Sequence, residues 1–592
     1  MSSRESRLGR EQAGGPQEGW LRSFGLFGLA AGGVIGSGWF LTPADAYRSA
    51  GSASHVLWSW AVGGLAMLVI AVVMVELGTA APRTGGMIFL PYQSSGPLVT
   101  LVVATSLWIY YVINLTGEAI AATIAIAPEI SSRLGTNLLR VDQSTGDRTL
   151  NGSGTGVAIV FMMIISAAVV LVPARRFVGA TAWITVIKVA GVFLVCMVLL
   201  AIFHYHGYAV SKYKLHAPEQ GEGDHSGHHG LLGAPIGGAD DSSQHGWLAT
   251  LGGSSTVYAY VGFQGPLDYA GDIKKDGIGE GARIRRAILV TVLLSILVYI
   301  LLQVTYNRYH GAVCAGDSAQ GCSTSPWVNP SDYLDIAGLT TVGYLRSILE
   351  WTLRILTMVA PLGAGLVYAY VLPSEIAELS RLGLTYRPLA TSAPRKNGWH
   401  IYWLVLAANV AFGTVLLVVF HGYWSMLSRF SGVLSLLLYA FPAVALVSLS
   451  SALDQKQPLP SASRRRFLRG ILPRVSFVVT ALMLYETGFS ILWRAIAALA
   501  VGVVVLVGAP TLRERLKSGR ALTNPDGSAA WAAAWLAGYL GGLLPLAWWA
   551  GRLTGTDRTF LACVVAVWAW VCCQAMIRHS RAYNAKVRPN LS

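Results

Sequence analysis

The stretch AGGVIGSGWFLTP, residues 31–43, lies inside the first long apolar segment of the chain and is poorly suited to a continuous helix. Five of its thirteen residues are Gly or Ser, which favour turns and helix ends over helix interiors. A membrane-spanning segment broken at its centre exposes backbone N–H and C=O groups, and these are costly in lipid unless they find partners. We therefore expect the backbone here to bind a solute.

Composition places the chain in a membrane. Its 592 residues are 54% hydrophobic and only 12% charged, with a mean hydropathy of +0.52. A soluble protein of this size has more charge and less apolar surface to hide. Apolar runs long enough to cross a bilayer predict an all-α polytopic membrane protein with fourteen spans: 24–47, 55–78, 97–125, 157–172, 179–204, 247–270, 286–306, 345–372, 401–420, 427–450, 475–490, 493–510, 530–550 and 559–577.

The positive charge of the chain sets its orientation. The net charge is +15, but the basic residues are spread thinly over short loops, which argues against a nucleic-acid partner. Fourteen spans place both termini on one side, and the segments on that side carry most of the 44 Lys and Arg residues. This bias predicts a multi-pass protein of the cell membrane with both termini in the cytoplasm. The oligomeric state stays open.

The spans and the polar stretches between them divide the chain into six segments. We expect a polar cytoplasmic tail at 1–23, a first five-helix repeat at 24–204, a His-rich outer loop at 205–246, a second five-helix repeat at 247–450, four additional transmembrane helices at 451–577 and a basic cytoplasmic tail at 578–592.

Two features of the outer loops bear on metal and redox chemistry. Cys314 and Cys322 share one loop, where a disulfide and two free thiols are both open. Seven of the twelve histidines cluster around the second loop, where they either bind a divalent metal or belong to a mobile polar insertion, and we favour the insertion. They are His204, His206, His216, His225, His228, His229 and His245. We predict no metal site and no cofactor.

A second break lies five spans after the first. Span six reads STVYAYVGFQGPLDYAGD, residues 255–272, and Gly262, Gly265 and Pro266 interrupt it near its middle. Broken segments at matching positions in two halves of a chain are typical of inverted-repeat transporters that bind their solute at mid-membrane. Spans 1–5 would form one repeat and spans 6–10 the other, with four spans added.

The two breaks together suit an α-amino acid. Free N–H groups at the start of a half-helix attract a carboxylate, and free carbonyls at the end of the preceding half attract an ammonium. Gly28, Gly32 and Gly36 also have the four-residue spacing of close helix packing, so span one alone does not decide between packing and binding. The proline in the second break favours binding.

Ionisable residues inside spans are expensive and are usually functional. Lys188 lies about nine residues into span five, and Glu118 lies in span three. Burial penalises the charged lysine, so Lys188 can exchange a proton during a transport cycle, with Glu118 as its partner or as a second proton site. A static Lys188–Glu118 pair is the alternative, and position alone favours neither.

Other charged residues receive more modest interpretations. Glu350 and Arg354 have the i, i+4 spacing of an ion pair on one helix, and Glu76 near the inner end of span two is interpreted as structural. The basic segment SASRRRFLRG, residues 461–470, is interpreted as a topology determinant. Asp268 lies past the break in span six, either facing a cavity or lining the inner pathway.

Several motifs together resemble the amino acid–polyamine–organocation (APC) superfamily of permeases, and in particular its fourteen-span bacterial branch that includes aspartate:proton symporters. The resemblance covers roughly residues 24–577. The motifs that carry it, with the lysine in span five, are GVIGSGWF (33–40), VELGTAAPRTGG (75–86), YVGFQGPLDYAGD (260–272) and YETGFSILW (485–493).

The resemblance implies a five-plus-five inverted-repeat core with discontinuous helices 1 and 6, plus four C-terminal helices. It also implies where the substrate binds. The residues that match the substrate carboxylate site are Ile35, Gly36, Ser37 and Gly38; the carbonyls that match the amine site belong to Tyr260, Val261 and Gly262; Tyr258 and Phe263 match the gate and the side-chain pocket.

The resemblance further implies that Lys188 stands where sodium-coupled relatives bind an ion. The chain departs from the family at the inner end of span eight, where members usually read Ser-Arg, five residues, then Arg-Asp-Gly. Here Ser374-Glu375 is followed by Arg381-Leu382-Gly383, so inner-gate ion pairs inferred from relatives are in doubt.

The sequence therefore predicts a secondary active amino acid transporter that takes up its substrate with protons by alternating access. An exchanger without proton coupling and a non-transporting amino acid sensor on the same scaffold are the alternatives. An enzyme is not expected, because no nucleophile motif or convergent acid–base cluster lies within the spans. Asp268 would favour a cationic substrate and Arg354 an anionic one, so the substrate side chain stays open.

Overall fold

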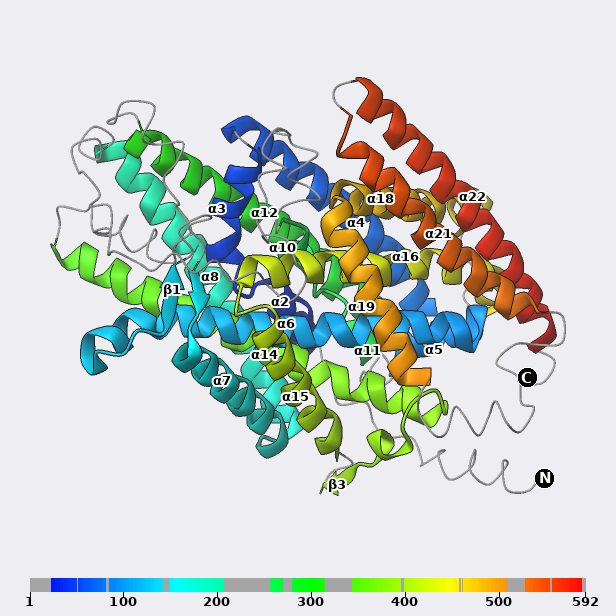
Figure 1. The fold of residues 1–592 in the computed structure, drawn as a ribbon, viewed down its shortest axis with the longest axis horizontal. Coiled ribbons are helices and arrows are strands. Elements are labelled where there is room, and N and C mark those ends of the chain that lie inside the picture. Colours follow the sequence, from blue (N-terminus) through cyan, green and yellow to red (C-terminus); the bar gives the residue numbers. More distant parts are fainter. Residues whose placement is uncertain are drawn as a thin grey trace.

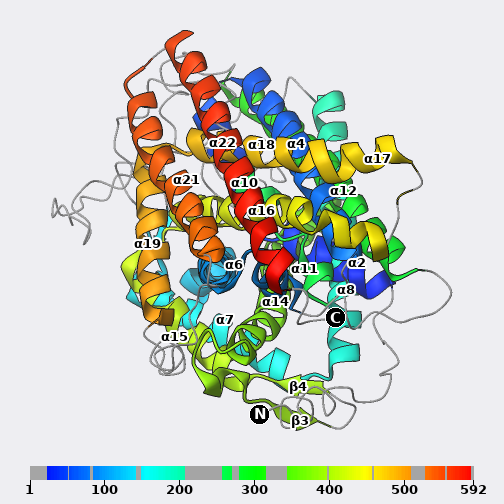
Figure 2. The same cartoon turned by 90° about the vertical axis from the view of Figure 1, so that its right-hand side faces the viewer.

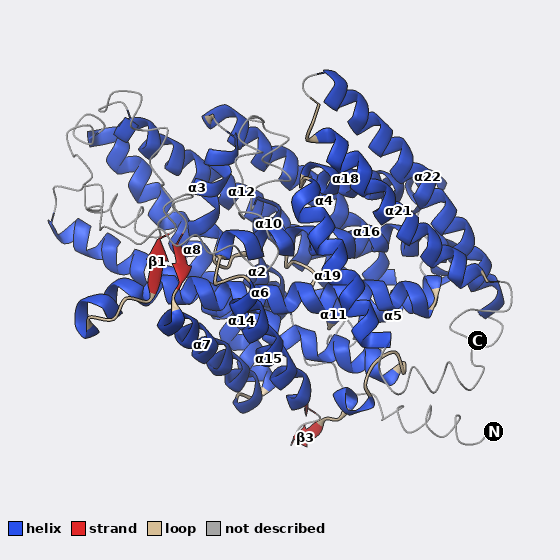
Figure 3. Cartoon of the chain, viewed as in Figure 1, coloured by secondary structure: helices blue, strands red, loops and turns tan. Residues whose placement is uncertain are grey.

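The computed structural model describes residues 23–50, 52–80, 85–141, 148–206, 256–269, 279–314, 343–395, 399–456, 459, 461–507, 527–553 and 556–587. Nearly all of these residues are helical (Figure 3), and the strands form two short antiparallel pairs at the edges of the bundle. The pairs are β1 (Leu139–Val141) with β2 (Arg148–Leu150), and β3 (Ala393–Arg395) with β4 (Trp399–Ile401).

The helices follow the predicted order of spans. The first half contains α2 (Ser23–Val34), α3 (Gly38–Ala50), α4 (Ala53–Ala80), α5 (Gly86–Ser95), α6 (Pro97–Leu134), α7 (Gly152–Leu171) and α8 (Ala174–His206). The second half contains α10 (Thr256–Tyr260), α11 (Gly265–Asp268), α12 (Glu280–Cys314), α14 (Gly343–Arg381), the 3-10 turn η4 (Arg387–Ala390), α15 (Trp403–Val419) and α16 (Trp424–Lys456). The C-terminal part contains α17 (Ala462–Arg466), the π turn η5 (Phe467–Ile471), α18 (Leu472–Glu486), α19 (Phe489–Val507), α21 (Ser528–Ala550) and α22 (Thr556–Val587).

The helix lengths confirm the polytopic all-α prediction. In the described part of the chain, twelve helices are long and apolar enough to cross a membrane. The two remaining predicted spans correspond to the interrupted pair α10 and α11 and to the shorter apolar helix α15. Span eleven, predicted at 475–490, is shifted toward the N-terminus, because a continuous helical segment runs through the π turn over Ala462–Glu486.

The packing of the helices shows the inverted repeat. Helices α6 and α14, in spans three and eight, pack against each other, and several contacts of one have a counterpart in the other half. Thus α6 packs on α16 as α14 packs on α8, and α6 packs on α15 as α14 packs on α7. Likewise α4 contacts α16 as α12 contacts α8. In Figure 1, α6 and α16 cross the middle of the molecule, around the short helices α10 and α11.

The two predicted breaks meet at the centre of the fold. Helix α2 ends at Val34 and α3 begins at Gly38, whereas α10 ends at Tyr260 and α11 begins at Gly265. A Cβ atom on Gly33 would lie 2.8 Å from the carbonyl oxygen of Gly262, so the two backbones touch. Gly262 has a φ of 107°, which side chains rarely allow.

The three glycines at four-residue spacing in span one make two kinds of contact. A Cβ atom on Gly28 would lie 2.6 Å from the Cα of Ala182 in α8, and one on Gly32 would lie 2.9 Å from the Thr185 hydroxyl. These two glycines therefore let α2 approach α8 closely, as small residues do between membrane helices. Gly36 is different, because it faces the Glu118 carboxylate.

The four additional helices cover one flank of the core. Helices α19, α21 and α22 lie on the outside of the bundle (Figures 1 and 2), packed against α6, α16 and α5. Among the described elements, those that pack most extensively on α10 and α11 all belong to the first ten spans.

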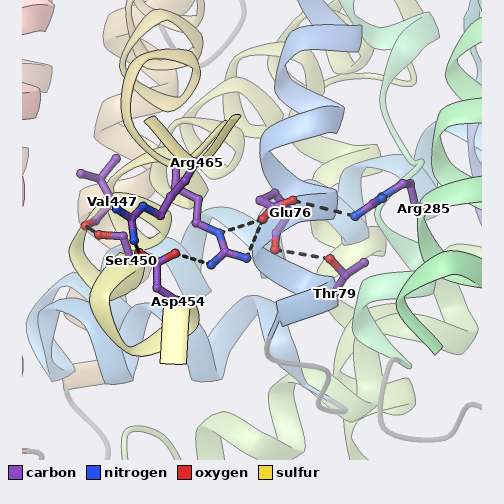
Figure 4. Close-up of polar contacts among 8 residues, drawn as sticks. Glu76, Thr79, Arg285, Val447, Ser450, Asp454 and Arg465 are labelled. Atoms are coloured by element: carbon purple, nitrogen blue, oxygen red, sulfur yellow. Dashed lines mark hydrogen bonds and ion pairs between the residues drawn. The ribbon is translucent and has the colours of Figure 1, made fainter. Parts of the chain in front are cut away.

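A buried arginine in the π turn joins the additional helices to the core. The guanidinium of Arg469 is 2% exposed and lies 2.8 Å from Glu76 of α4 and 2.7 Å from Asp454 of α16. Glu76 also reaches Arg285 at 3.9 Å, and Arg465 pairs with Asp454 at 3.7 Å (Figure 4). The structural interpretation of Glu76 is thus supported, whereas Arg469 is more than the topology determinant that its basic segment suggested.

Two further features bear on the sequence interpretation. Arg354 forms an ion pair with Glu129 of α6, a contact between helices that the i, i+4 spacing does not predict, and its half-exposed side chain lies outside the central site. Cys322, the histidines of the 205–246 loop beyond His206, the predicted N-terminal tail before Ser23 and the residues after Val587 lie outside the described residues. Residues 578–587 of the predicted C-terminal tail continue helix α22.

Candidate functional site

The eleven residues singled out in the sequence come from four regions of the chain and are all buried. The first break supplies Ile35 to Gly38, the second supplies Tyr258 to Phe263, and α6 and α8 supply one ionisable residue each. The fold brings both breaks and both ionisable side chains to the centre of the ten-span core, as the inverted repeat requires.

A carboxylate from α6 occupies the start of α3. The backbone N–H of Ser37 donates to Glu118 Oε2 at 2.8 Å, and the Tyr258 hydroxyl donates to Glu118 Oε1 at 2.9 Å. The Trp424 indole N–H donates to the Ser37 hydroxyl at 3.0 Å, which orders that side chain. A Cβ atom on Gly36 would overlap the Glu118 carboxylate, so glycine is needed here for the carboxylate to approach.

An ammonium from α8 occupies the end of α2. Lys188 Nζ, fully buried, donates to the carbonyl of Gly32 at 2.7 Å. The next two carbonyls also accept from side chains, because the Tyr368 hydroxyl donates to Gly33 at 2.9 Å and the Tyr299 hydroxyl donates to Val34 at 3.0 Å. The C-terminal carbonyls that a broken helix leaves unpaired are thus satisfied by side chains of three different helices.

The charges match the helix dipoles. An anion lies at the N-terminal end of α3 and a cation lies at the C-terminal end of α2, where each is favoured. Lys188 and Glu118 form no direct ion pair in the described structure, because each bonds to the backbone of the first break instead. Glu118 and Lys188 thus occupy the two ends of the break at which we predicted that the carboxylate and ammonium of a substrate bind.

The second break is held by a chain of side chains. The N–H of Gly262 donates to the Tyr439 hydroxyl at 3.2 Å, and Tyr439 donates to Gln264 at 2.6 Å. Tyr260 takes no part in these hydrogen bonds. Its hydroxyl donates to the carbonyl of Trp60 at 2.8 Å, and its ring lies against the Trp60 indole. The ring of Phe263 lies 5.2 Å from the ring of Tyr439.

Comparison with known proteins assigns the family. Residues 21–509 match the family model described as amino acid permease. The chain belongs to this family. It is 24% identical over 494 residues to the glutamate/serine transporter AimA of Bacillus subtilis, covering 82% of this chain and 80% of that protein. It is 23% identical over 507 residues to the aspartate-proton symporter of the same organism, covering 83% of each chain.

Membership confirms the resemblance seen in the motifs. The permease is a multi-pass membrane protein of the APC superfamily and a transporter rather than an enzyme. The two relatives are named for transport of amino acids, and each covers about the same length of sequence as the permease. The roles of the individual site residues stay predictions, since neither comparison assigns them.

Sequence reasoning missed the aromatic residues that shape the permease site. Tyr299, Tyr368 and Trp424 each hydrogen-bond to the first break, and Tyr439 bonds to the second. Their only signal is a general one, namely that a Tyr or Trp buried in an apolar span needs a polar partner. Which carbonyl or N–H serves as that partner depends on the packing of helices far apart in the chain.

Proposed function

We propose that the permease imports an α-amino acid together with protons by alternating access, with both termini in the cytoplasm. The observation that carries the proposal is the pair of side-chain charges at the first break, where Glu118 and Lys188 occupy the positions suited to a substrate carboxylate and ammonium. The names of the two relatives, one a glutamate/serine transporter and the other an aspartate-proton symporter, support the same class of substrate.

Glu118 supplies a direct link between substrate and proton. Glu118 accepts a hydrogen bond from the Ser37 N–H, and we expect the same N–H to donate to the substrate carboxylate. Two carboxylates at one N–H repel each other, because both are acceptors and both are negative. A proton bound to a Glu118 oxygen removes that charge, and the substrate carboxylate then accepts from Ser37. Substrate therefore binds best when Glu118 is protonated.

Lys188 supplies a second link, to the movement of span one. Its ammonium ties α8 to the Gly32 carbonyl at the end of α2. A charged donor makes a stronger hydrogen bond than a neutral one, so loss of the lysine proton weakens the tie between α8 and α2. Rocking of α2 against α8 is the type of motion that alternating access requires.

The test is uptake of a panel of labelled amino acids into proteoliposomes, with and without an inward proton gradient. Wild type is compared with Lys188→Ala, Glu118→Gln and the control Arg354→Ala, whose half-exposed side chain lies outside the site. We expect gradient-stimulated uptake of at least one amino acid by wild type and by the control. Glu118→Gln keeps an acceptor for Ser37 without a titrating charge, so we expect its substrate binding to become independent of pH and its gradient-driven accumulation to be lost.

Other outcomes separate the alternatives. Uptake that occurs only against preloaded internal substrate, with no effect of the gradient, identifies an exchanger. Substrate binding without uptake under any gradient identifies a sensor. Lys188→Ala and Glu118→Gln proteins that still accumulate substrate in response to the gradient would refute the coupling roles of both residues.

A further inference from the structure

A second pair of buried ionisable groups lies away from Lys188 and Glu118. Asp268 of α11 and Glu375 of α14 are both 0% exposed, and their side chains lie within hydrogen-bonding distance of each other. Helix α11 packs against α14 and α5 (Figure 1), so the pair joins the inner half of broken span six to span eight.

In each of the two carboxyl groups, one oxygen has a hydrogen-bond donor and the other has none. The Tyr111 hydroxyl donates to Asp268 Oδ2 at 2.8 Å, and the backbone N–H of Ile88 donates to Glu375 Oε2 at 3.2 Å. The other oxygen of each group, Asp268 Oδ1 and Glu375 Oε1, is buried and has no donor. Among the described residues, no Lys or Arg side chain pairs with either group.

Such an arrangement needs a proton between the two groups. Ionised carboxylates only accept hydrogen bonds, so two of them in contact repel each other and neither can supply the donor that the other lacks. One shared proton turns the repulsion into a hydrogen bond between the two groups. We propose that Asp268 and Glu375 form a second proton-binding site of the permease, holding one shared proton between α11 and α14.

The surrounding hydrogen bonds support this assignment because they all point toward Asp268. Gly262 N–H donates to Tyr439, Tyr439 donates to Gln264, Gln264 donates to Tyr111 at 3.2 Å, and Tyr111 donates to Asp268. This series of hydrogen bonds begins at the second break and ends at the Asp268–Glu375 pair. Its donors stabilise negative charge on Asp268 Oδ2, which leaves Oδ1 as the atom that needs the shared proton.

The other ionisable groups near the pair do not replace the proton. Tyr110 and Tyr111 of α6 and Tyr439 of α16 interact electrostatically with Asp268 and are neutral donors at ordinary pH. Glu378 of α14 interacts with Glu375 and adds like charge, although Arg381 lies 3.3 Å from it.

The shared proton has a consequence for the inner gate, which rests on the orientation and transport proposed above. With the proton present, the pair holds α11 to α14. Loss of the proton to the cytoplasmic side puts two negative charges in contact in a buried setting, which pushes α11 and α14 apart. The pair therefore makes opening toward the cytoplasm depend on the internal pH.

The first experiment reads the proton directly and needs no transport. Infrared difference spectra of the purified full-length protein are recorded as the pH is raised, and the carbonyl stretch of protonated carboxyl groups is followed. Protonated Glu118 has a carboxyl band of its own in wild type, so the band of the pair is the titrating band that we expect to persist in Glu118→Gln and in the control Glu378→Gln. The band is expected to be lost in Asp268→Asn and in Glu375→Gln, whose amides donate the hydrogen bond that the shared proton provides.

The outcomes separate this inference from the proposed function. A wild-type carboxyl band that Asp268→Asn and Glu375→Gln leave unchanged overturns the second site, whatever the transport assays show. If either variant fails to fold, the other variant tests the same carboxyl band. Transport is measured in proteoliposomes, on the condition that wild type transports. We expect Asp268→Asn to weaken the dependence of substrate release on internal pH, while the dependence on external pH remains. An unchanged internal-pH profile overturns the gating role even where proton-coupled uptake itself is confirmed.

Discussion

Replacing Gly262 by alanine tests whether the two breaks touch as the fold places them. Gly262 has a φ of 107°, and its Cβ would lie 2.8 Å from the backbone carbon of Gly33 and 2.8 Å from the Tyr368 hydroxyl. The substitution therefore has two costs. The first is backbone strain in a region that alanine rarely adopts, and the second is steric overlap with a neighbouring backbone that cannot move away cheaply.

The structure gives a magnitude and a matched control for each cost. Backbone strain of this type costs about 2 kcal/mol and overpacking costs about 2 kcal/mol, so Gly262→Ala should lose about 4 kcal/mol of stability. Gly135, at the end of α6, has a φ of 62° and nothing within 4 Å of its added Cβ. Gly135→Ala therefore has strain without overlap, and its strain is milder, about 1 kcal/mol, because this φ lies in the left-handed region that side chains can adopt. Gly33→Ala isolates the overlap with Gly262.

The assay is thermal unfolding of the purified variants in detergent, followed by intrinsic tryptophan fluorescence. We expect the midpoints to fall in the order wild type, Gly135→Ala, Gly33→Ala and Gly262→Ala. Gly262→Ala should also lose substrate binding, because its carbonyl is part of the predicted amine site. A midpoint for Gly262→Ala no lower than that of Gly135→Ala would refute the contact between the two breaks.

Three further predictions concern charge and space elsewhere in the fold. Arg469→Met removes the buried cation that pairs with Glu76, which is buried, and with Asp454, which is 24% exposed, and should cost about 3 kcal/mol of stability. The half-exposed Arg465→Met should change the unfolding midpoint little. Gly36→Ala should lower substrate uptake at least tenfold, because its methyl group displaces the carboxylate of Glu118. Gly38→Ala, whose Cβ meets nothing closer than 3.4 Å, should retain uptake. Arg354→Ala should cost at most about 1 kcal/mol and leave substrate selectivity unchanged, and a shift in selectivity measured by competition in proteoliposomes would contradict its placement outside the site.

Local properties of the sequence determined the architecture of the permease. Apolar runs of spanning length must become helices in lipid because no other backbone arrangement satisfies its own hydrogen bonds there, so the spans are readable one at a time. The two breaks are readable for the same reason, because Gly and Pro weaken a helix wherever they occur. Their separation by five spans then indicated the inverted repeat, and the family motifs located the residues that line both breaks.

Only the tertiary structure decided which residue meets which. The sequence left open whether Lys188 and Glu118 are static partners or proton-exchanging groups; in the structure each bonds to the broken backbone of span one. Asp268 was left between two roles, and its pairing with Glu375 became visible only when α11 and α14 were placed side by side. The physical reason is that spacing along one helix shows which residues share a face, whereas contacts between helices depend on how distant spans pack.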